Sequence, residues 1–209
     1  MIRQQPDDLL ERNTVSKTLL ILVVVAGALI LGGISTYNGL VGKQQGVDAA
    51  WAQVSNQYQR RADLVPNLVA TVKAAAASET QILTQVTEAR SRATSINITT
   101  DDLSDPETFR KFEEGQNQLT QALGQLRTVV EAYPQLQSQQ GFKDLNIELA
   151  GTENRINTAR MRYNEAVQQY NTTIRTFPDI IGAKVIHGAK PMTPFRAAAG
   201  AEKAPEVKF

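Results

Sequence analysis

The longest apolar stretch of this chain lies close to its N-terminus. No charged residue occurs between Thr18 and Val41, and positions 19–31 contain only Leu, Ile, Val, Ala and Gly. An α-helix needs about 20 uncharged residues to cross the hydrocarbon core of a bilayer. The pattern therefore predicts a polar N-terminal segment at 1–17 and a transmembrane helix at 18–36 that would contact the lipid bilayer.

A cleaved signal peptide is the competing interpretation of this stretch. The small residues Ala26-Gly27-Ala28 resemble a cleavage site. Leu29, Ile30 and Leu31 follow at once, however, and they make a poor start for a mature soluble protein. A buried helix of a soluble domain is seldom apolar on every side. The pattern favours an uncleaved membrane anchor.

The orientation of the anchor follows from the lysines and arginines on either side of it. Arg3, Arg12 and Lys17 precede the span, and only Lys43 follows within about 15 residues, the window in which positive charge sets orientation. This bias predicts a cytoplasmic N-terminus and places the main domain on the non-cytoplasmic side.

After the span, apolar residues recur at spacings of three and four, a coiled-coil-like period that lines one face of a helix. The first stripe is Val47, Trp51, Val54, Tyr58, Leu68, Val72, Ala75, Ile82, Val86, Ala89 and Ala93. The second is Phe109, Phe112, Leu119, Leu123, Leu126, Val130 and Tyr133. The third is Leu145, Leu149, Ile156, Tyr163, Val167, Tyr170 and Ile174. A loop is expected at 95–105, and Asp105-Pro106 is typical of a helix start. Phe177-Pro178 should end the last helix.

The first stripe raises the question of whether Pro66 kinks one long helix or reverses the chain. A single helix over residues 47–94 would be about 70 Å long at 1.5 Å per residue, against about 40 to 50 Å for the others. Half of its stripe would then face water unless a second chain covered it. Folding back at Asp63–Pro66 gives four segments of similar length, each able to bury its stripe.

The resulting prediction is an all-α protein. Its N-terminal transmembrane helix precedes an antiparallel, up-and-down four-helix bundle at 37–178, followed by a disordered or extended C-terminal tail at 179–209. The alternative is a three-helix arrangement with one kinked helix, which would need a homo-oligomer to cover the long stripe.

Composition excludes several classes of function. The net charge of +1 gives no basic footprint for nucleic acid. The chain has no cysteine and a single histidine, His187, so most metal and nucleophilic sites lack their residues. Glu148, Glu153 and Glu165 have no helical histidine to complete a di-iron site. The sequence predicts no enzyme activity, no metal and no cofactor.

One short stretch combines residues that could bind a ligand. Arg60, Arg61, Asp63, Pro66 and Asn67 form a candidate site where two guanidinium groups would meet an anion at a helix start. The alternative is structural: a turn held by charge-assisted hydrogen bonds, with the arginine stems packed on apolar neighbours. Trp51 is in phase with the apolar stripe, which predicts a core position.

These residues lie in a longer stretch, YNGLVGKQQGVDAAWAQVSNQYQRRADLVPNLVATVK at 37–73, that resembles the signature region of the LemA family of bacterial membrane proteins. Phe177-Pro178, Phe195, Pro205 and Phe209 also fit the family, although Pro194 stands where an aromatic residue usually precedes the phenylalanine. The resemblance implies a four-helix bundle that a single transmembrane helix anchors to the bacterial inner membrane. It carries over no catalytic residues.

Two functional hypotheses follow. The first is a non-enzymatic adaptor for other membrane proteins, with a membrane protease as a partner, because genes of LemA-like proteins often accompany such proteases. The second is a membrane-tethered sensor that binds a small anionic ligand or a lipid headgroup near Arg60 and Arg61.

Overall fold

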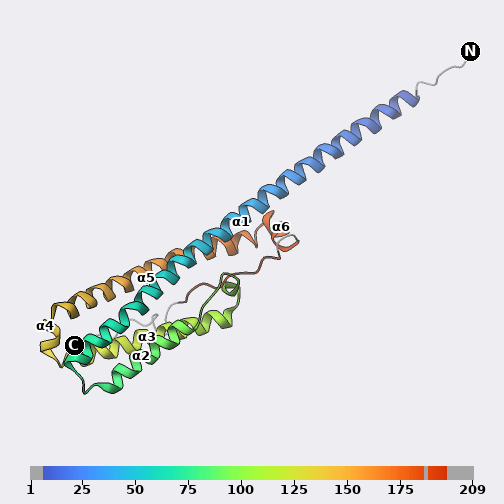
Figure 1. Ribbon diagram of the computed structural model, residues 1–209. Helices are drawn as coiled ribbons and strands as arrows, with labels where there is room; N and C mark the ends of the chain where they lie inside the picture. The colour runs from blue at the N-terminus through green and yellow to red at the C-terminus, as the bar shows by residue number, and fades with distance from the viewer. Residues whose placement is uncertain (1–6, 186–187, 197–209) are drawn as a thin grey trace, which may run out of the picture. The chain divides into compact units, whose positions relative to one another are not determined.

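The computed structural model describes residues 7–185 and 188–196, and within these ranges the chain is helical and contains no strand. The helices are α1 (Asp7–Ala75), α2 (Thr80–Ser95), α3 (Pro106–Val130), α4 (Pro134–Ser138), α5 (Gln140–Thr173) and α6 (Asp179–Val185), with a short 3-10 helix, η1 (Asp101–Ser104), between α2 and α3 (Figure 1). The chain divides into a smaller unit, Met1–Gly42 with Thr173–Ala189, and a larger unit, Lys43–Thr172 with Lys190–Phe209.

The smaller unit contains the apolar stretch. From Leu19 to Ile34, each large apolar side chain of α1 is at least half exposed. Among the described residues, α1 is the one helix long and apolar enough to cross a membrane, and none of its apolar window is buried in protein. Water is a poor solvent for so much contiguous apolar surface, which a bilayer would cover.

The short helix α6 packs within the smaller unit. A Cβ atom on Gly182 would lie 3.3 Å from the Thr36 side chain, so glycine permits this close approach. The tail predicted at 179–209 was expected to be extended or disordered, and for Asp179–Val185 that expectation is wrong. Residues 188–196 have no regular secondary structure, and Met192 and Phe195 are buried. Residues 197–209 lie outside the described ranges.

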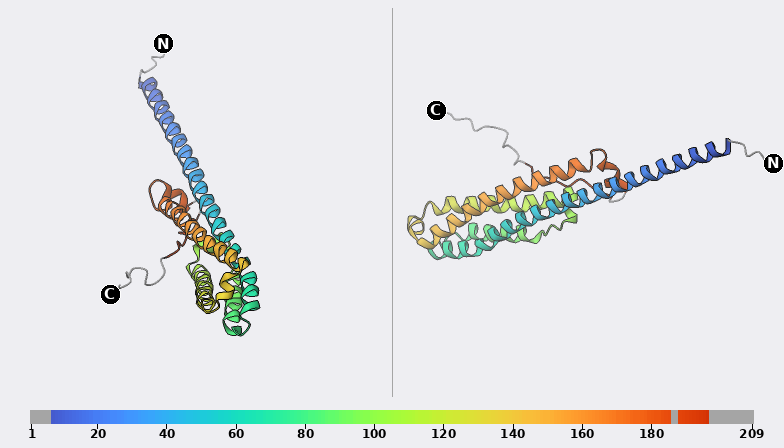
Figure 2. Two further views of the ribbon diagram at one scale, coloured as in Figure 1. Left: turned by 90° about the vertical axis from the view of Figure 1, so that its left-hand side faces the viewer. Right: turned by 90° about the horizontal axis from the view of Figure 1, so that it is seen from above.

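The larger unit packs four helical segments side by side: the part of α1 after Lys43, α2, α3 and α5 (Figures 1 and 2). The apolar stripes meet between them. At one end the core consists of aliphatic side chains with one phenylalanine, among them Val72, Val86, Leu119, Leu126, Leu136 and Phe142. Gly115 lets α3 approach α2, because a Cβ there would lie 3.4 Å from the Cα of Ala93.

The predicted start of α3 is confirmed. Asp105 is its N-cap, and the Asp105 carboxylate accepts hydrogen bonds from the Glu107 amide at 3.1 Å and the Thr108 hydroxyl at 2.6 Å. Pro106 occupies the first helical position, where its missing N–H leaves no carbonyl without a donor.

The chain reversal predicted at Asp63–Pro66 is wrong. Helix α1 runs through Pro66 to Ala75, and the turn follows at residues 76–79, where the Glu79 amide donates to the Ala76 carbonyl at 3.1 Å. A proline inside a helix leaves the carbonyl four residues earlier without its usual donor. That carbonyl belongs to Ala62, and Arg90 of α2 donates its Nε–H to it at 2.7 Å. A side chain from the next helix therefore satisfies the group that the proline leaves free.

This replacement bond can be tested with a double-mutant cycle. Arg90→Met keeps an apolar stem and removes the donor, so it should lower the free energy of unfolding by about 1–2 kcal/mol. In a Pro66→Ala background residue 66 regains an N–H for the Ala62 carbonyl, and Arg90→Met should then cost about 1 kcal/mol less. Urea unfolding of the full chain in detergent, followed by far-UV circular dichroism, measures both. Equal costs in the two backgrounds would contradict the assignment.

Candidate functional site

The side chain of Arg61 lies in the interior of the larger unit and is only 1% exposed. Its Nη1 donates to the Glu153 carboxylate at 2.8 Å and to the Thr120 hydroxyl at 2.9 Å. Its Nη2 donates to the Gln116 side-chain oxygen at 2.6 Å and to the Gln116 carbonyl at 3.3 Å. A charge taken out of water needs such compensation, because an unpaired buried ion costs several kcal/mol.

The Arg61 network connects all four helical segments of the larger unit. Arg61 belongs to α1, Gln116 to α3 and Glu153 to α5. The Gln116 amide donates to the Ala93 carbonyl at the end of α2, at 3.1 Å. The guanidinium carbon of Arg61 also lies 5.1 Å from the centre of the Tyr58 ring, within the range of a cation–π contact.

The other residues of the predicted candidate site do not join Arg61. Arg60 has a side chain 57% exposed that forms an ion pair with Glu148. Asp63 accepts a hydrogen bond from Gln59 one turn earlier, and both are exposed. Adjacent residues of an α-helix point about 100° apart, because 3.6 residues make one turn, so Arg60 and Arg61 face different surroundings. Pro66 and Asn67 are both exposed in the same helix.

Trp51 is a core residue, as predicted, with 5% of its surface exposed. Its ring centroid lies 5.4 Å from that of Phe112 and 5.5 Å from that of Tyr163, both in edge-on arrangements. The indole N–H donates to the Ile98 carbonyl at 3.3 Å. Phe109 and Phe195 complete the aromatic cluster. Aromatic pairs at these separations stabilise a core beyond their area alone.

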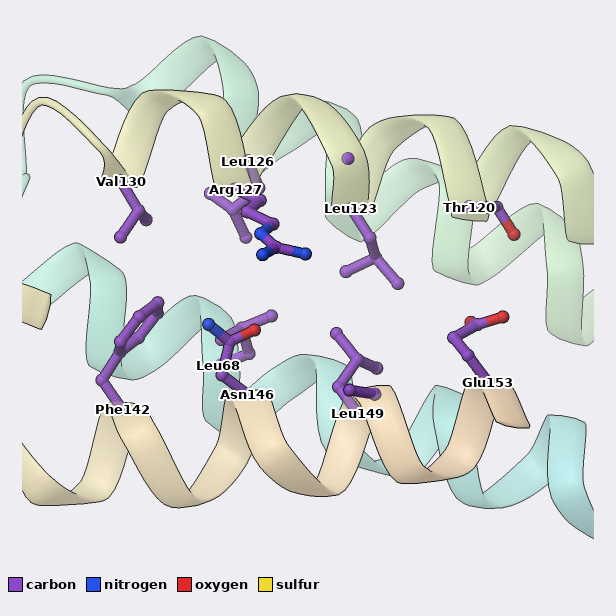
Figure 3. A pocket seen from close by; sticks show the side chains of 12 residues that line it. Leu68, Thr120, Leu123, Leu126, Arg127, Val130, Phe142, Asn146, Leu149 and Glu153 are labelled. Carbon is purple, nitrogen blue, oxygen red and sulfur yellow. The ribbon is translucent and has the colours of Figure 1, made fainter. Parts of the chain in front are cut away.

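An open groove runs between α3 and α5 and has a volume of about 270 Å³ (Figure 3). Figure 3 shows Leu123 and Val130 pointing from α3 toward Phe142 and Leu149 on α5. Further lining residues are Leu68, Thr120, Gly124, Leu126, Arg127, Asn146, Ala150 and Glu153. We call this the α3–α5 groove. Sequence reasoning missed it, because Leu149 fits the apolar stripe whether or not a helix covers it.

The α3–α5 groove carries one cation of its own. Arg127 lines it, and the Arg127 side chain makes no ion pair with any residue in the part of the chain that the structure describes. At the other end, Thr120 and Glu153 line the groove and also bind Arg61. The groove is thus mainly apolar, with an available guanidinium group along one wall.

A comparison with known families decides the identity of this scaffold. The family model described as the LemA family matches residues 50–209, more than half of the chain. This chain belongs to the LemA family. The match includes Trp51, the Arg61 network and both walls of the α3–α5 groove, and it begins after the apolar stretch of α1. Together, the family and the apolar helix identify a membrane-associated helical protein.

Two curated relatives of this LemA-family chain are the Magnetosome protein MamQ 2 and the Magnetosome protein MamQ 1 of Paramagnetospirillum magneticum (strain ATCC 700264 / AMB-1). Each is 44% identical to it over 57 residues, which is 27% of this chain and 21% of the relative. The chain therefore matches about a fifth of the length of these relatives.

The LemA signature stretch also contains Asp48, which sequence reasoning did not single out. Its Oδ1 atom is buried and has no hydrogen-bond partner among the described residues. Burial raises the pKa of the Asp48 carboxyl, and the negative charge of Asp101 raises it further. The described residues contain no cluster of three His, Cys, Asp or Glu side chains suited to a metal ion.

The two adjacent arginines allow a matched test of the buried network. Arg61→Met should lower the free energy of unfolding by roughly 3 kcal/mol, because Gln116 and Glu153 lose a charged partner. Arg60→Met removes an exposed ion pair and should cost less than about 1 kcal/mol. Urea unfolding followed by circular dichroism compares them. Similar losses for both variants would show that Arg61 is no more important to the fold than a surface residue.

Asp48 makes the stability of the LemA chain depend on pH. Its pKa is raised in the folded state, so the folded chain binds the proton more tightly than the unfolded chain does. The carboxylate is therefore destabilising above its folded pKa, and this cost disappears as the pH falls to its ordinary value of 3.8. Asp48→Asn should raise the melting temperature at neutral pH and leave it unchanged below that value.

The Asp48 variant has an internal control. Asp101→Asn removes the charge that raises the pKa of Asp48, so it should stabilise the chain in the same direction and by less. Melting curves of both variants across the acidic range would show this order. Destabilisation by Asp48→Asn at neutral pH would mean that a partner holds the carboxylate.

Proposed function

We propose that this LemA-family chain is a non-enzymatic adaptor of the bacterial inner membrane, and that it binds a helix of another membrane protein in the α3–α5 groove. In this proposal residues 18–36 span the bilayer once. The segments after Lys43 form an antiparallel four-helix bundle on the non-cytoplasmic side. The observation that carries the proposal is the groove itself, which is open, mainly apolar and flanked by α3 and α5 (Figure 3).

The shape and chemistry of the α3–α5 groove favour a helical occupant. Its lining is mainly apolar and includes Leu68, Leu123, Phe142 and Leu149. An amphipathic helix buries its apolar face in such a groove and presents side chains at intervals of three and four residues. The partner helix should carry an acidic residue opposite Arg127, because that guanidinium group has no carboxylate partner in the described chain.

Membrane anchoring supports an adaptor role in a second way. Two proteins tethered to one bilayer meet at a high effective concentration, so a modest groove suffices for association. A membrane-bound protease is the first partner class to test, as the family resemblance implies. The positive charge before the span supports the orientation with the bundle outside the cytoplasm.

The second candidate function is a sensor of a small anionic ligand, and Arg127 favours it. The sequence placed this ligand near Arg60 and Arg61, where Glu148 and Glu153 already neutralise the guanidinium groups. In the α3–α5 groove an amphiphile could pair an anionic head with Arg127 and bury its chain among the leucines. The groove volume of about 270 Å³ is slightly below the usual range of about 300–1,000 Å³ for small-molecule sites.

Photocrosslinking in native membranes tests the adaptor proposal. A photoreactive amino acid replaces Asn146, which lines the groove, or Met161, which is exposed on the same helix and serves as the control. We expect Asn146 to capture a membrane protein reproducibly and Met161 not to capture it. Capture of lipid or a small molecule alone at Asn146 would favour the sensor.

A groove-filling variant shows whether the captured protein occupies the α3–α5 groove. A Cβ on Gly124 meets nothing within 4 Å, so Gly124→Leu adds a bulky side chain to the lining of the groove from a position with open space around its Cβ. Gly46, on α1, has equally open surroundings, and Gly46→Leu is the matched control. Capture from Asn146 should be lost in Gly124→Leu and kept in Gly46→Leu. Undiminished capture in Gly124→Leu would refute the proposed docking site.

A further inference from the structure

Two asparagine side chains of α5 hold the extended segment Lys190–Arg196 by its backbone. The Asn171 amide donates to the Met192 carbonyl at 2.8 Å, and the Met192 amide donates back to the Asn171 oxygen at 2.9 Å. Asn164 makes the same pair of bonds with Phe195, at 3.0 and 2.9 Å. A carboxamide that both donates and accepts in this way offers the peptide what a neighbouring β-strand would offer.

The spacing of the two asparagines matches the repeat of an extended chain. Asn164 and Asn171 are seven residues apart, which is about 10.5 Å along an α-helix at 1.5 Å per residue. Met192 and Phe195 are three residues apart, which is about 10 Å in an extended segment at 3.3 Å per residue. The two periods agree, so both asparagines reach backbone groups without distortion of either partner.

The remaining hydrogen bonds of the segment also go to its backbone. The Tyr163 hydroxyl donates to the Thr193 carbonyl at 2.9 Å, and the Thr193 amide donates to the Leu103 carbonyl at 2.8 Å. Arg160 donates to the Arg196 carbonyl at 3.1 Å. The segment thus uses three amide donors between residues 191 and 195. The two other residues in that interval are Pro191 and Pro194, which have no N–H to offer.

Side-chain recognition is limited to two anchors. Phe195 is buried, with its ring centroid 4.9 Å from that of Phe109 and 6.2 Å from that of Trp51. The Arg160 guanidinium carbon lies 4.5 Å from the centre of the Phe195 ring. Met192 is the second buried side chain of the segment. An extended, proline-containing ligand in an aromatic-lined groove that reads mostly backbone is a known form of peptide recognition.

We propose that this surface, the tail groove, is a peptide receptor whose resident ligand is the chain's own segment 190–196. It also accepts an extended, proline-containing segment of a partner protein that carries an aliphatic residue three positions before an aromatic one. Backbone recognition makes the groove tolerant of sequence, and the prolines reduce the entropy lost on binding. The resident segment competes at a high effective concentration and so limits access for the partner. The tail groove is distinct from the α3–α5 groove, so either proposal can fail alone.

The test uses the full chain in detergent and a synthetic peptide of sequence KPMTPFR, identical to residues 190–196. Trp51 is the only tryptophan, and it contacts Phe195, so its fluorescence reports occupancy of the tail groove. Phe195→Ala weakens the resident segment. The variant should bind the peptide at least about tenfold more tightly than the wild type, because competition by the tail is reduced. Met192→Ala, at the other anchor, should have the same effect if Phe195→Ala does not fold.

Asparagine variants in the Phe195→Ala background test the mode of binding. Asn164→Asp and Asn171→Asp keep the side-chain shape and remove the N–H donor, so each should abolish saturable binding. Asn154→Asp, at an exposed position of α5, is the control and should leave binding unchanged. Equal weakening of peptide binding by all three asparagine variants would overturn the proposal. The absence of saturable peptide binding by a folded Phe195→Ala or Met192→Ala chain would overturn it too.

A second peptide tests tolerance of sequence. KPLSPYR keeps the prolines, an aliphatic residue and an aromatic residue in register, and KALSAAR removes the prolines and the aromatic anchor. The tail groove should bind the first peptide within about tenfold of the resident sequence and fail to bind the second. If KPMTPFR binds and KPLSPYR does not, the partner-peptide proposal is wrong. Residues 190–196 would then make an intramolecular contact only.

Discussion

The architecture of the larger unit depends on how one positive charge is kept away from water. Arg61 lies in the middle of the helical segments, and its guanidinium group is neutralised by Glu153 and hydrogen-bonded by Gln116 and Thr120. Gln116 and Thr120 are four residues apart on one face of α3, so they set the position of α3 along α1. Apolar packing alone tolerates a helix that slides by one turn. The same slide would leave the buried charge of Arg61 without its partners, which costs several kcal/mol. The network therefore fixes the register in which the apolar stripes meet.

A second arginine explains why the chain does not turn where proline suggests. Pro66 leaves the Ala62 carbonyl without a helical donor, and Arg90 supplies one from α2. The donor comes from 28 residues further along the chain, so no local rule could have revealed it. The apolar phase through Pro66 was the correct signal for a continuous helix. The length argument against it assumed that the stripe ran unbroken to residue 94, whereas the chain turns after Ala75.

The features that sequence predicted correctly are those that depend on neighbouring residues. The apolar helix follows from an uncharged run, the cap at Asp105 from two adjacent residues, and the burial of Trp51 from its phase. The features that it missed join residues far apart. The partners of Arg61 come from two later helices, and the docking of Phe195 depends on Asn164 and Asn171. Their seven-residue spacing was visible, but two polar residues on one face are ordinary in a surface helix, and only the fold places an extended segment beside them.

The signature stretch and the binding surfaces therefore have different tasks. Within 37–73, Trp51 packs in an aromatic core, Arg61 fixes the register of the helices, and Pro66 is accommodated by Arg90. These residues are occupied with the scaffold itself. The two proposed binding surfaces consist mainly of later residues, although Leu68 lines the α3–α5 groove and Trp51 contacts Phe195 of the tail groove. Arg127 and Phe142 line the α3–α5 groove, and Asn164 holds Phe195 in the tail groove. A motif that builds the scaffold identifies a family without identifying a partner. In both proposals, selectivity among partners comes from the side chains of α3 and α5.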